Sequence, residues 1–174
     1  MAFLRTDIPG ARWVDQENYH ITLRFFGTLD YRTADALAYE LTKIQAEPFA
    51  IRLSGLGSFG GNKPRAIWAG ITAGPELKQL AANHERAAQA AGLDPLSRKF
   101  SPHLTLARMR RAKPHAVAHF LKTFGDYTSG QIQINQISLL SSRTNSGGGP
   151  YVVEQIYPLE NNAETTSPGS GLDE

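Results

Sequence analysis

The alternation of apolar and polar residues along the chain predicts two groups of elements in the same order. In each group a strand is followed by a helix and then by two strands that form a hairpin. The first group is expected over about residues 19–27, 31–46, 49–53 and 66–72. The second group is expected over about residues 102–109, 114–124, 131–141 and 151–159. Within these elements, β-branched and aromatic residues or period-two alternation indicate strands, and apolar positions every three or four residues indicate helices.

Capping and breaking residues indicate where the expected helices begin and end. Asp30 can cap the first helix, and Pro48 lies just beyond its end. An additional Ala-rich helix is expected over about residues 75–91, between the two groups, with a proline in its first turn and a glycine after its end. The chain is therefore expected to mix helices and strands along its whole length.

An offset of 83 residues relates the two groups. It carries His20 onto His103 and Thr22 onto Thr105, and it also aligns apolar positions in the helices and in the strands that follow them. One register that aligns a strand, a helix face and a second strand is typical of an internal repeat. We therefore expect a β-α-β-β unit used twice, in an α+β fold of two pseudo-symmetric lobes.

The repeat also suggests how the chain is divided. Residues 1–159 are expected to form one domain with lobes over roughly 12–73 and 74–159, between which the C-terminal strand can be exchanged. The offset leaves the first lobe without most of the helix that leads into the second. Residues 160–174 are poor in apolar side chains and rich in Ser, Thr, Gly and Pro, so we expect a disordered tail.

Composition limits the class of protein. Of the 174 residues, 41% are hydrophobic and 20% charged, as is usual for a globular protein. The absence of cysteine excludes disulfides, thiolate metal sites and cysteine nucleophiles. No apolar run approaches the roughly 18 residues of a membrane span, and the first residues lack the apolar core of a secretory signal. We expect a cytoplasmic protein that does not bind membranes.

The formal net charge of +2 conceals an uneven distribution. The last fifteen residues or so carry only acidic charges, whereas the segment between residues 98 and 113 carries only basic ones. These basic residues are Arg98, Lys99, Arg108, Arg110, Arg111 and Lys113. Such a basic run suits a partner that carries phosphates, although a solvated loop and strand end can have the same composition.

The motif His-x-Thr-Leu occurs twice, at residues 20–23 and 103–106. On a strand, alternate side chains share a face, so the His and the Thr of each motif point the same way while the residues between them point to the core. Two lobes related by a pseudo-twofold axis can bring both His–Thr pairs to one cleft. The pairing of the motifs at the repeat offset makes them the strongest functional signal in the chain.

Two histidines in one cleft suit proton transfer on both sides of a reacting group. An imidazole with an ordinary pKa near 6.5 can take or give a proton at neutral pH, so His20 and His103 can provide a general base and a general acid. The hydroxyls of Thr22 and Thr105 can donate hydrogen bonds to the non-bridging oxygens of an anion. This layout suits in-line displacement at phosphorus. No Asp, Glu or third His lies at ligand spacing, so no metal or other cofactor is expected.

Four further side chains are candidate substrate contacts: Arg24, Phe26, Arg65 and Arg108. Arg24 and Phe26 share the face of the first histidine on the expected strand, so Arg24 can reach the cleft directly. Phe26 can stack on a nucleobase or pack in the core. Arg65 begins an expected strand and is either a phosphate contact or a surface residue. Arg108 lies on the opposite face of its strand from the second histidine and needs a bulge or a strand end to reach the cleft.

With these paired motifs, the sequence resembles the two-histidine phosphoesterase superfamily. It resembles more closely the bacterial and archaeal RNA 2′,3′-cyclic phosphodiesterases once described as 2′-5′ RNA ligases. The stretches that carry this resemblance cover about residues 11–159 and are ARWVDQENYHITLRFFG, PRAIWAGI, SPHLTLARMR and GPYVVEQIYPL. The resemblance implies two lobes, each with an antiparallel sheet, around a central cleft. It also implies a first strand and helix, which we expect to be missing from this sequence.

The resemblance further implies a role for each motif residue. His103 is the proton acceptor that activates water, His20 is the proton donor to the departing ribose oxygen, and Thr22 and Thr105 bind the phosphate oxygens. We therefore predict a monomeric, metal-independent hydrolase of RNA processing that converts 2′,3′-cyclic phosphates at RNA ends to 2′-phosphomonoesters. The motifs leave open a small cyclic nucleotide or an ADP-ribose cyclic phosphate as substrate, weak reverse ligation, and a non-catalytic module that only binds RNA ends.

Overall fold

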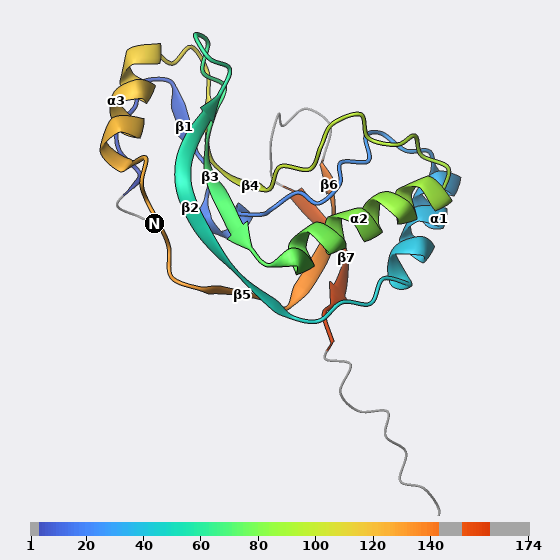
Figure 1. Cartoon of the computed structure of the whole chain (residues 1–174). Helices are drawn as coiled ribbons and strands as arrows, with labels where there is room; N and C mark the ends of the chain where they lie inside the picture. The colour runs from blue at the N-terminus through green and yellow to red at the C-terminus, as the bar shows by residue number, and fades with distance from the viewer. Residues whose placement is uncertain (1–3, 143–150, 161–174) are drawn as a thin grey trace, which may run out of the picture.

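The computed structural model describes residues 4–142 and 151–160 of the chain (Figure 1). Its described α-helices are α1 (Tyr31–Thr42), α2 (Pro75–Ala90) and α3 (Pro114–Phe124). Its described strands are β1 (Ala11–Trp13), β2 (Phe49–Phe59), β3 (Ala66–Ala73), β4 (His103–Met109), β5 (Ile132–Ile134), β6 (Gln136–Ser142) and β7 (Tyr151–Pro158). None of these helices is long and apolar enough to cross a membrane.

The strands form a curled antiparallel sheet and a separate two-stranded ribbon. The sheet has the order β1-β4-β3-β2-β5, and the ribbon pairs β6 with β7. The predicted α+β class is therefore confirmed. Because β4 lies between β1 and β3, the sheet takes strands from both halves of the sequence, and the proposed lobe boundary between residues 73 and 74 stays a prediction.

The helices lie on two sides of this sheet. Figure 1 shows α3 on one side of the curled sheet and α1 and α2 on the other. Under α3, Val117 and Phe120 belong to a core cluster with strand residues such as Ile67 and Leu106. A second cluster joins the start of β2 to the first turns of α2. The first cluster contains Leu104 and Leu106 of the second motif, and Ile21 and Leu23 of the first motif pack against the second cluster.

Helix α1 begins where the sequence predicts and ends earlier. The Asp30 carboxylate caps it by accepting a hydrogen bond of 3.0 Å from the Thr33 backbone N–H. This bond, together with that of the Thr33 hydroxyl, lowers the pKa of Asp30. Leu37 and Leu41 pack against α2 in a third cluster. The helix ends at Thr42 rather than near residue 46, and Ile44 beyond its end still packs against the same cluster.

The predicted strand over residues 19–27 is wrong. The segment has the right composition for a strand, but in the structure it makes one isolated antiparallel bridge, between Ile21 and Leu104 of β4. The same edge of β4 is already occupied further along by β1, which pairs with residues 107–109. A strand needs a partner along its whole length, and this segment has one only at a single residue.

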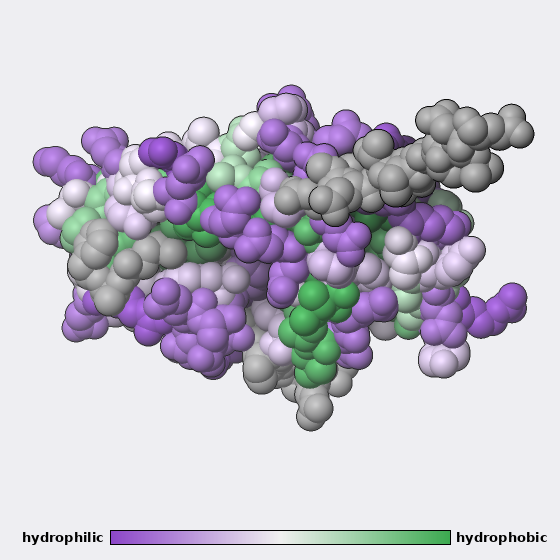
Figure 2. Space-filling view, turned by 90° about the horizontal axis from the view of Figure 1, so that it is seen from below, coloured by the Kyte–Doolittle hydropathy of each residue, from purple (hydrophilic) through white to green (hydrophobic). Residues whose placement is uncertain are grey.

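The strand expected over residues 131–141 is divided into β5, at the edge of the sheet, and β6, in the ribbon. The other sequence predictions differ from the structure mainly at the ends of elements. Strand β2 is longer than predicted and contains a register shift after Leu53, next to Gly55, whose positive φ of 74° suits glycine. Strand β1 was not predicted. Residues 161–174 of the expected tail lie outside the described residues. Hydrophilic side chains cover most of the surface seen from below, and apolar side chains show in smaller areas (Figure 2).

Candidate active site

The two His-x-Thr-Leu segments meet at their centres. Ile21 of the first segment and Leu104 of the second form the antiparallel bridge, and the 83-residue offset relates these two residues to each other. A bridge between equivalent residues lies on the pseudo-twofold axis of the repeat, as in an interface between two identical subunits. The axis inferred from the sequence therefore passes between the two motifs.

This bridge determines how the polar side chains are placed. Ile21 and Leu104 take part in the hydrophobic clusters, so their neighbours in each segment face the other way. In this antiparallel register His20 lies across from Thr105, and Thr22 lies across from His103. One face at the junction of the two segments thus presents two imidazoles and two hydroxyls.

Both imidazoles are held by the same kind of hydrogen bond. His20 Nδ1 lies 2.8 Å from the carbonyl oxygen of Asn18, and His103 Nδ1 lies 2.9 Å from that of Ser101. A carbonyl oxygen can only accept, so Nδ1–H is the donor in each case. The Nε2 atom of each histidine is thereby left as the position that can take or give a proton. The offset also relates Asn18 to Ser101, so the repeat extends to the groups that orient the histidines.

Neither threonine hydroxyl has a hydrogen-bond partner within residues 4–142 and 151–160, and Thr22 is exposed. Thr105 is half-buried and pairs with Trp68 in the register of β3 and β4. Both hydroxyls can therefore donate to an anion placed between the histidines. The structure brings together the four motif residues that the sequence singled out.

Aromatic rings lie beside both histidines, and they are not among the candidate residues that the sequence indicated. The ring of Tyr151 lies edge-on to His20 with 4.9 Å between centroids. The centroid of the His103 ring lies 5.0 Å from that of Phe59 and 6.4 Å from that of Trp68. The offset carries Trp68 onto Tyr151. This equivalence in the sequence is the signal that could have identified both residues.

Arg108 and Arg65 lie at the same end of strands β4 and β3, where Arg108 pairs with Ala66. The Arg108 guanidinium donates a hydrogen bond of 3.4 Å to the Tyr151 hydroxyl, so it reaches the ring that contacts His20. Arg65 is exposed, and its carbonyl oxygen accepts from the backbone N–H of Met109. Their roles as phosphate contacts stay predictions.

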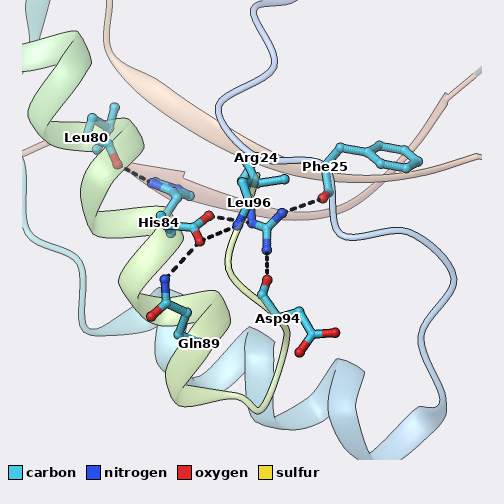
Figure 3. Close-up of polar contacts among 8 residues, drawn as sticks. Arg24, Phe25, Leu80, His84, Gln89, Asp94 and Leu96 are labelled. Carbon is cyan, nitrogen blue, oxygen red and sulfur yellow. Dashed lines mark hydrogen bonds and ion pairs between the residues drawn. The ribbon is translucent and has the colours of Figure 1, made fainter. Parts of the chain in front are cut away.

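Arg24 and Phe26 contact other parts of the protein than the motif histidines. Figure 3 shows the Arg24 guanidinium beside α2 and the segment at residues 94–96, where its Nε lies 2.8 Å from Glu85 Oε2. Phe26 packs against the cluster formed by Leu37 and Leu41 of α1. Substrate contact by Arg24 or Phe26 stays a prediction, one that these internal contacts do not favour.

The basic run between residues 98 and 113 is exposed at each of its charged side chains. Within the described part of the chain, none of these cations belongs to an ion pair, and the pairs present there are Arg5–Asp15, Arg24–Glu85 and Lys43–Glu40. Cations without an acidic partner, lying before, within and after β4 in the sequence, suit a polyanionic partner. Among the described residues there is no group of three or more His, Asp or Glu that could hold a metal ion.

Comparison with known proteins identifies the family of the chain. Residues 8–146 match the family model described as the 2′-5′ RNA ligase superfamily. The chain is 36% identical over 140 residues to the RNA 2′,3′-cyclic phosphodiesterase of Aeropyrum pernix, a match that covers 79% of each protein. It is 33% identical over 153 residues to the RNA 2′,3′-cyclic phosphodiesterase of Aquifex aeolicus, covering 84% of this chain and 81% of that one.

Solved structures share the fold. The crystal structure of E. coli LigT complexed with 3′-AMP superposes with a TM-score of 0.68 at 24% identity, covering 87% of this chain and 83% of that one. A crystal structure of a Thermus thermophilus protein superposes with a TM-score of 0.66 at 23% identity over the same shares of the two chains. The arrangement of helices around a curled antiparallel sheet is therefore common to these proteins.

Proposed function

Because the chain belongs to the 2′-5′ RNA ligase superfamily, we propose that it hydrolyses 2′,3′-cyclic phosphates at RNA ends and leaves 2′-phosphomonoesters. The observation that carries this proposal is the bridge between Ile21 and Leu104, which joins two His–Thr pairs whose Nε2 atoms have no hydrogen-bond partner among the described residues. The names of the relatives from Aeropyrum and Aquifex support the same class of reaction.

In the proposed mechanism, His103 and His20 act on opposite sides of the phosphorus atom. Neutral His103 accepts a proton at Nε2 from a water molecule, whose oxygen forms a new bond to phosphorus. The bond from phosphorus to the ribose 3′-oxygen breaks, and protonated His20 gives its Nε2 proton to that oxygen. The histidines finish in the opposite protonation states and exchange protons with solvent before the next turnover.

The other site residues bind the phosphate as charge develops on it. Thr22 and Thr105 donate hydrogen bonds to the non-bridging oxygens, and Arg108 and Arg65 supply positive charge at the end of β3 and β4. Donors that are already in place when the charge develops stabilise the transition state without reorganisation. No step requires a metal ion, because the cyclic ester is strained and each histidine contributes roughly 10²–10⁴-fold.

Two features favour an RNA hydrolase over the alternatives. A module that only binds phosphate would be better served by Arg or Lys at the motif positions, because these stay charged at neutral pH. A substrate as small as a cyclic nucleotide would not extend along the exposed basic run, whereas an RNA strand would gain from it. We place the enzyme in the cytoplasm as a monomer, which cell fractionation and size-exclusion chromatography can test.

The test is hydrolysis of a short RNA that ends in a 2′,3′-cyclic phosphate, with EDTA present and the position of the product phosphate determined. We expect turnover that EDTA does not change and a 2′-phosphate product. Oligomers should be better substrates than a cyclic mononucleotide, and that advantage should fall with added salt. Tight binding without turnover would instead indicate a binding module, and equal rates on all lengths would favour a small-molecule substrate.

A further inference from the structure

Arg24 forms one ion pair and two hydrogen bonds through its guanidinium, although its segment is irregular. Its Nε lies 2.8 Å from Glu85 Oε2 of α2. One terminal nitrogen donates to the Asp94 carbonyl oxygen at 2.7 Å. The other donates at 3.2 Å to the carbonyl oxygen of Phe25, the next residue in the chain (Figure 3). The side chain is only 5% exposed, so all of its charge is directed into the protein.

Glu85 connects the same ion pair to a third segment. Its Oε1 accepts hydrogen bonds of 2.9 Å from the backbone N–H of Leu96 and of 2.9 Å from the Gln89 side chain. Burial alone would raise the pKa of Glu85, but these two hydrogen bonds and the charge of Arg24 outweigh it and lower that pKa. The carboxylate is therefore ionised at neutral pH and remains paired with the guanidinium.

The pair joins the parts of the chain that carry the two histidines. Arg24 lies four residues after His20, in a segment that has no strand ladder and only the bridge at Ile21. Leu96 lies in the connection that leads from α2 to His103 at the start of β4. The pair is partly buried, with 24% of the Glu85 side chain exposed. Such a pair adds little net stability, but it can fix one arrangement of the groups around it. Here the groups around it are the two motif segments.

We propose that the Arg24–Glu85 ion pair is a positioning device that fixes the segment of His20 relative to that of His103. Arg24 then acts through the backbone between residues 20 and 24 rather than by touching the substrate. The effect of this ion pair on kcat rests on the function proposed above. Its effect on the position of His20 does not depend on that function.

Three variants separate positioning from direct contact with substrate. Arg24→Met removes the charge and its hydrogen bonds, Glu85→Gln keeps the shape and the acceptor for Leu96 but removes the charge, and Arg24→Lys keeps the charge without the branched guanidinium. Lys43→Met is the matched control, because Lys43 forms an ion pair with Glu40 on the surface of α1. Thermal unfolding reports whether each variant is folded.

The measurements are kcat, KM, the pH dependence of kcat and the NMR signal of the His20 imidazole. We expect kcat to fall by about tenfold or more in Arg24→Met and Glu85→Gln, because a displacement near 1 Å can cost on the order of 10²-fold. KM should change less than kcat, the pH profile should move, and Arg24→Lys should recover part of the loss. The His20 signal should shift in the first two variants, and Lys43→Met should match the unmodified protein.

Other results would overturn the proposal. A folded Arg24→Met protein with unchanged kcat and an unchanged His20 signal would show that the pair positions nothing. An increase in KM alone, again without a shift of the His20 signal, would show that Arg24 binds substrate directly. If Arg24→Met does not fold, the same comparisons are made on Glu85→Gln and Arg24→Lys.

The two proposals fail in different ways. If the unmodified protein does not hydrolyse cyclic phosphates, the proposed function fails. The NMR signal of His20 in the variants still decides whether the pair positions that histidine, because it needs no substrate. If the unmodified protein is active and the variants leave both kcat and the His20 signal unchanged, only the positioning role fails.

Discussion

Each motif histidine is oriented before any substrate arrives. The carbonyl oxygens of Asn18 and Ser101 receive Nδ1–H of His20 and His103 at nearly the same distance, so the tautomer is set by the backbone rather than by a carboxylate. The same kind of acceptor at both histidines leaves Nε2 of each imidazole as the atom that faces a substrate. This equivalence of surroundings suits a pair that exchanges protonation states during turnover.

Tyr151 is expected to support His20 mainly through its ring. Tyr151→Phe keeps the edge contact with His20 and loses the long hydrogen bond from Arg108, so kcat should stay within about threefold while KM rises modestly. Tyr151→Leu removes the aromatic contact, which is worth about 0.5–1.5 kcal/mol, and kcat should fall by up to about tenfold. Steady-state kinetics on the cyclic RNA substrate compare the two. Equal effects of both substitutions would contradict a role for the ring.

The elements around the site differ in how far the sequence predicts them. Helices α1, α2 and α3 follow from helical spacing together with their caps, because those signals are local. The segment at residues 19–27 was predicted as a strand and is not one, because β-forming composition does not say whether a partner strand is available along its length. The Arg24–Glu85 contact was likewise not predictable, since it joins positions 61 residues apart that belong to no motif.

Gly57 of β2 provides space for the Trp68 ring beside His103. A methyl group at Gly57 would overlap the Trp68 indole. Gly57→Ala should therefore destabilise the protein by about 1–3 kcal/mol and lower kcat, because the displaced ring also contacts His103. Gly130→Ala is the control, since a Cβ at that position meets no atom within 4 Å. Urea unfolding and kinetics measure both effects, and equal stability of the two variants would contradict this packing role.

His84 makes helix α2 sensitive to acid. It is 5% exposed; burial lowers its pKa, although the hydrogen bond of Nδ1–H to the Leu80 carbonyl acts in the opposite direction. In the unfolded chain His84 takes up a proton near pH 6.5, whereas in the folded protein it does so only at lower pH. The free energy of unfolding should therefore decrease as the pH falls below about 6.5, by at most about 1.4 kcal/mol per pH unit from this residue.

Replacement of His84 tests that contribution. Urea unfolding at pH 7.5 and pH 5.5 should give a smaller loss of stability for His84→Gln than for the unmodified protein. His119→Gln, which changes an exposed histidine of α3, should keep the full loss. If His84→Gln showed the same loss as the unmodified protein, burial of this imidazole would not be the cause of acid sensitivity.

At the scale of the whole molecule, the internal repeat is the feature that the sequence predicts best. The offset of 83 residues relates the two histidines, the residues whose carbonyls orient them, the two bridge residues, and Trp68 to Tyr151. The offset does not predict which strands pair with one another. Strand β4 of the second group pairs with β3, in the same sheet as β2. Repetition in a sequence determines which positions are equivalent, whereas the partners of each strand depend on the complete chain.

The central claim is that His103 and His20 act as base and acid on the two sides of one phosphate. The most direct measurement compares His20→Ala and His103→Ala on the cyclic RNA substrate and on an analogue in which sulfur replaces the departing ribose 3′-oxygen. On the natural substrate each substitution should lower kcat by roughly 10²–10⁴-fold. A thiolate leaves without needing a proton, so the analogue should restore turnover to His20→Ala and not to His103→Ala. Turnover that survives in both variants on the natural substrate, or restoration of His103→Ala alone, would contradict the account.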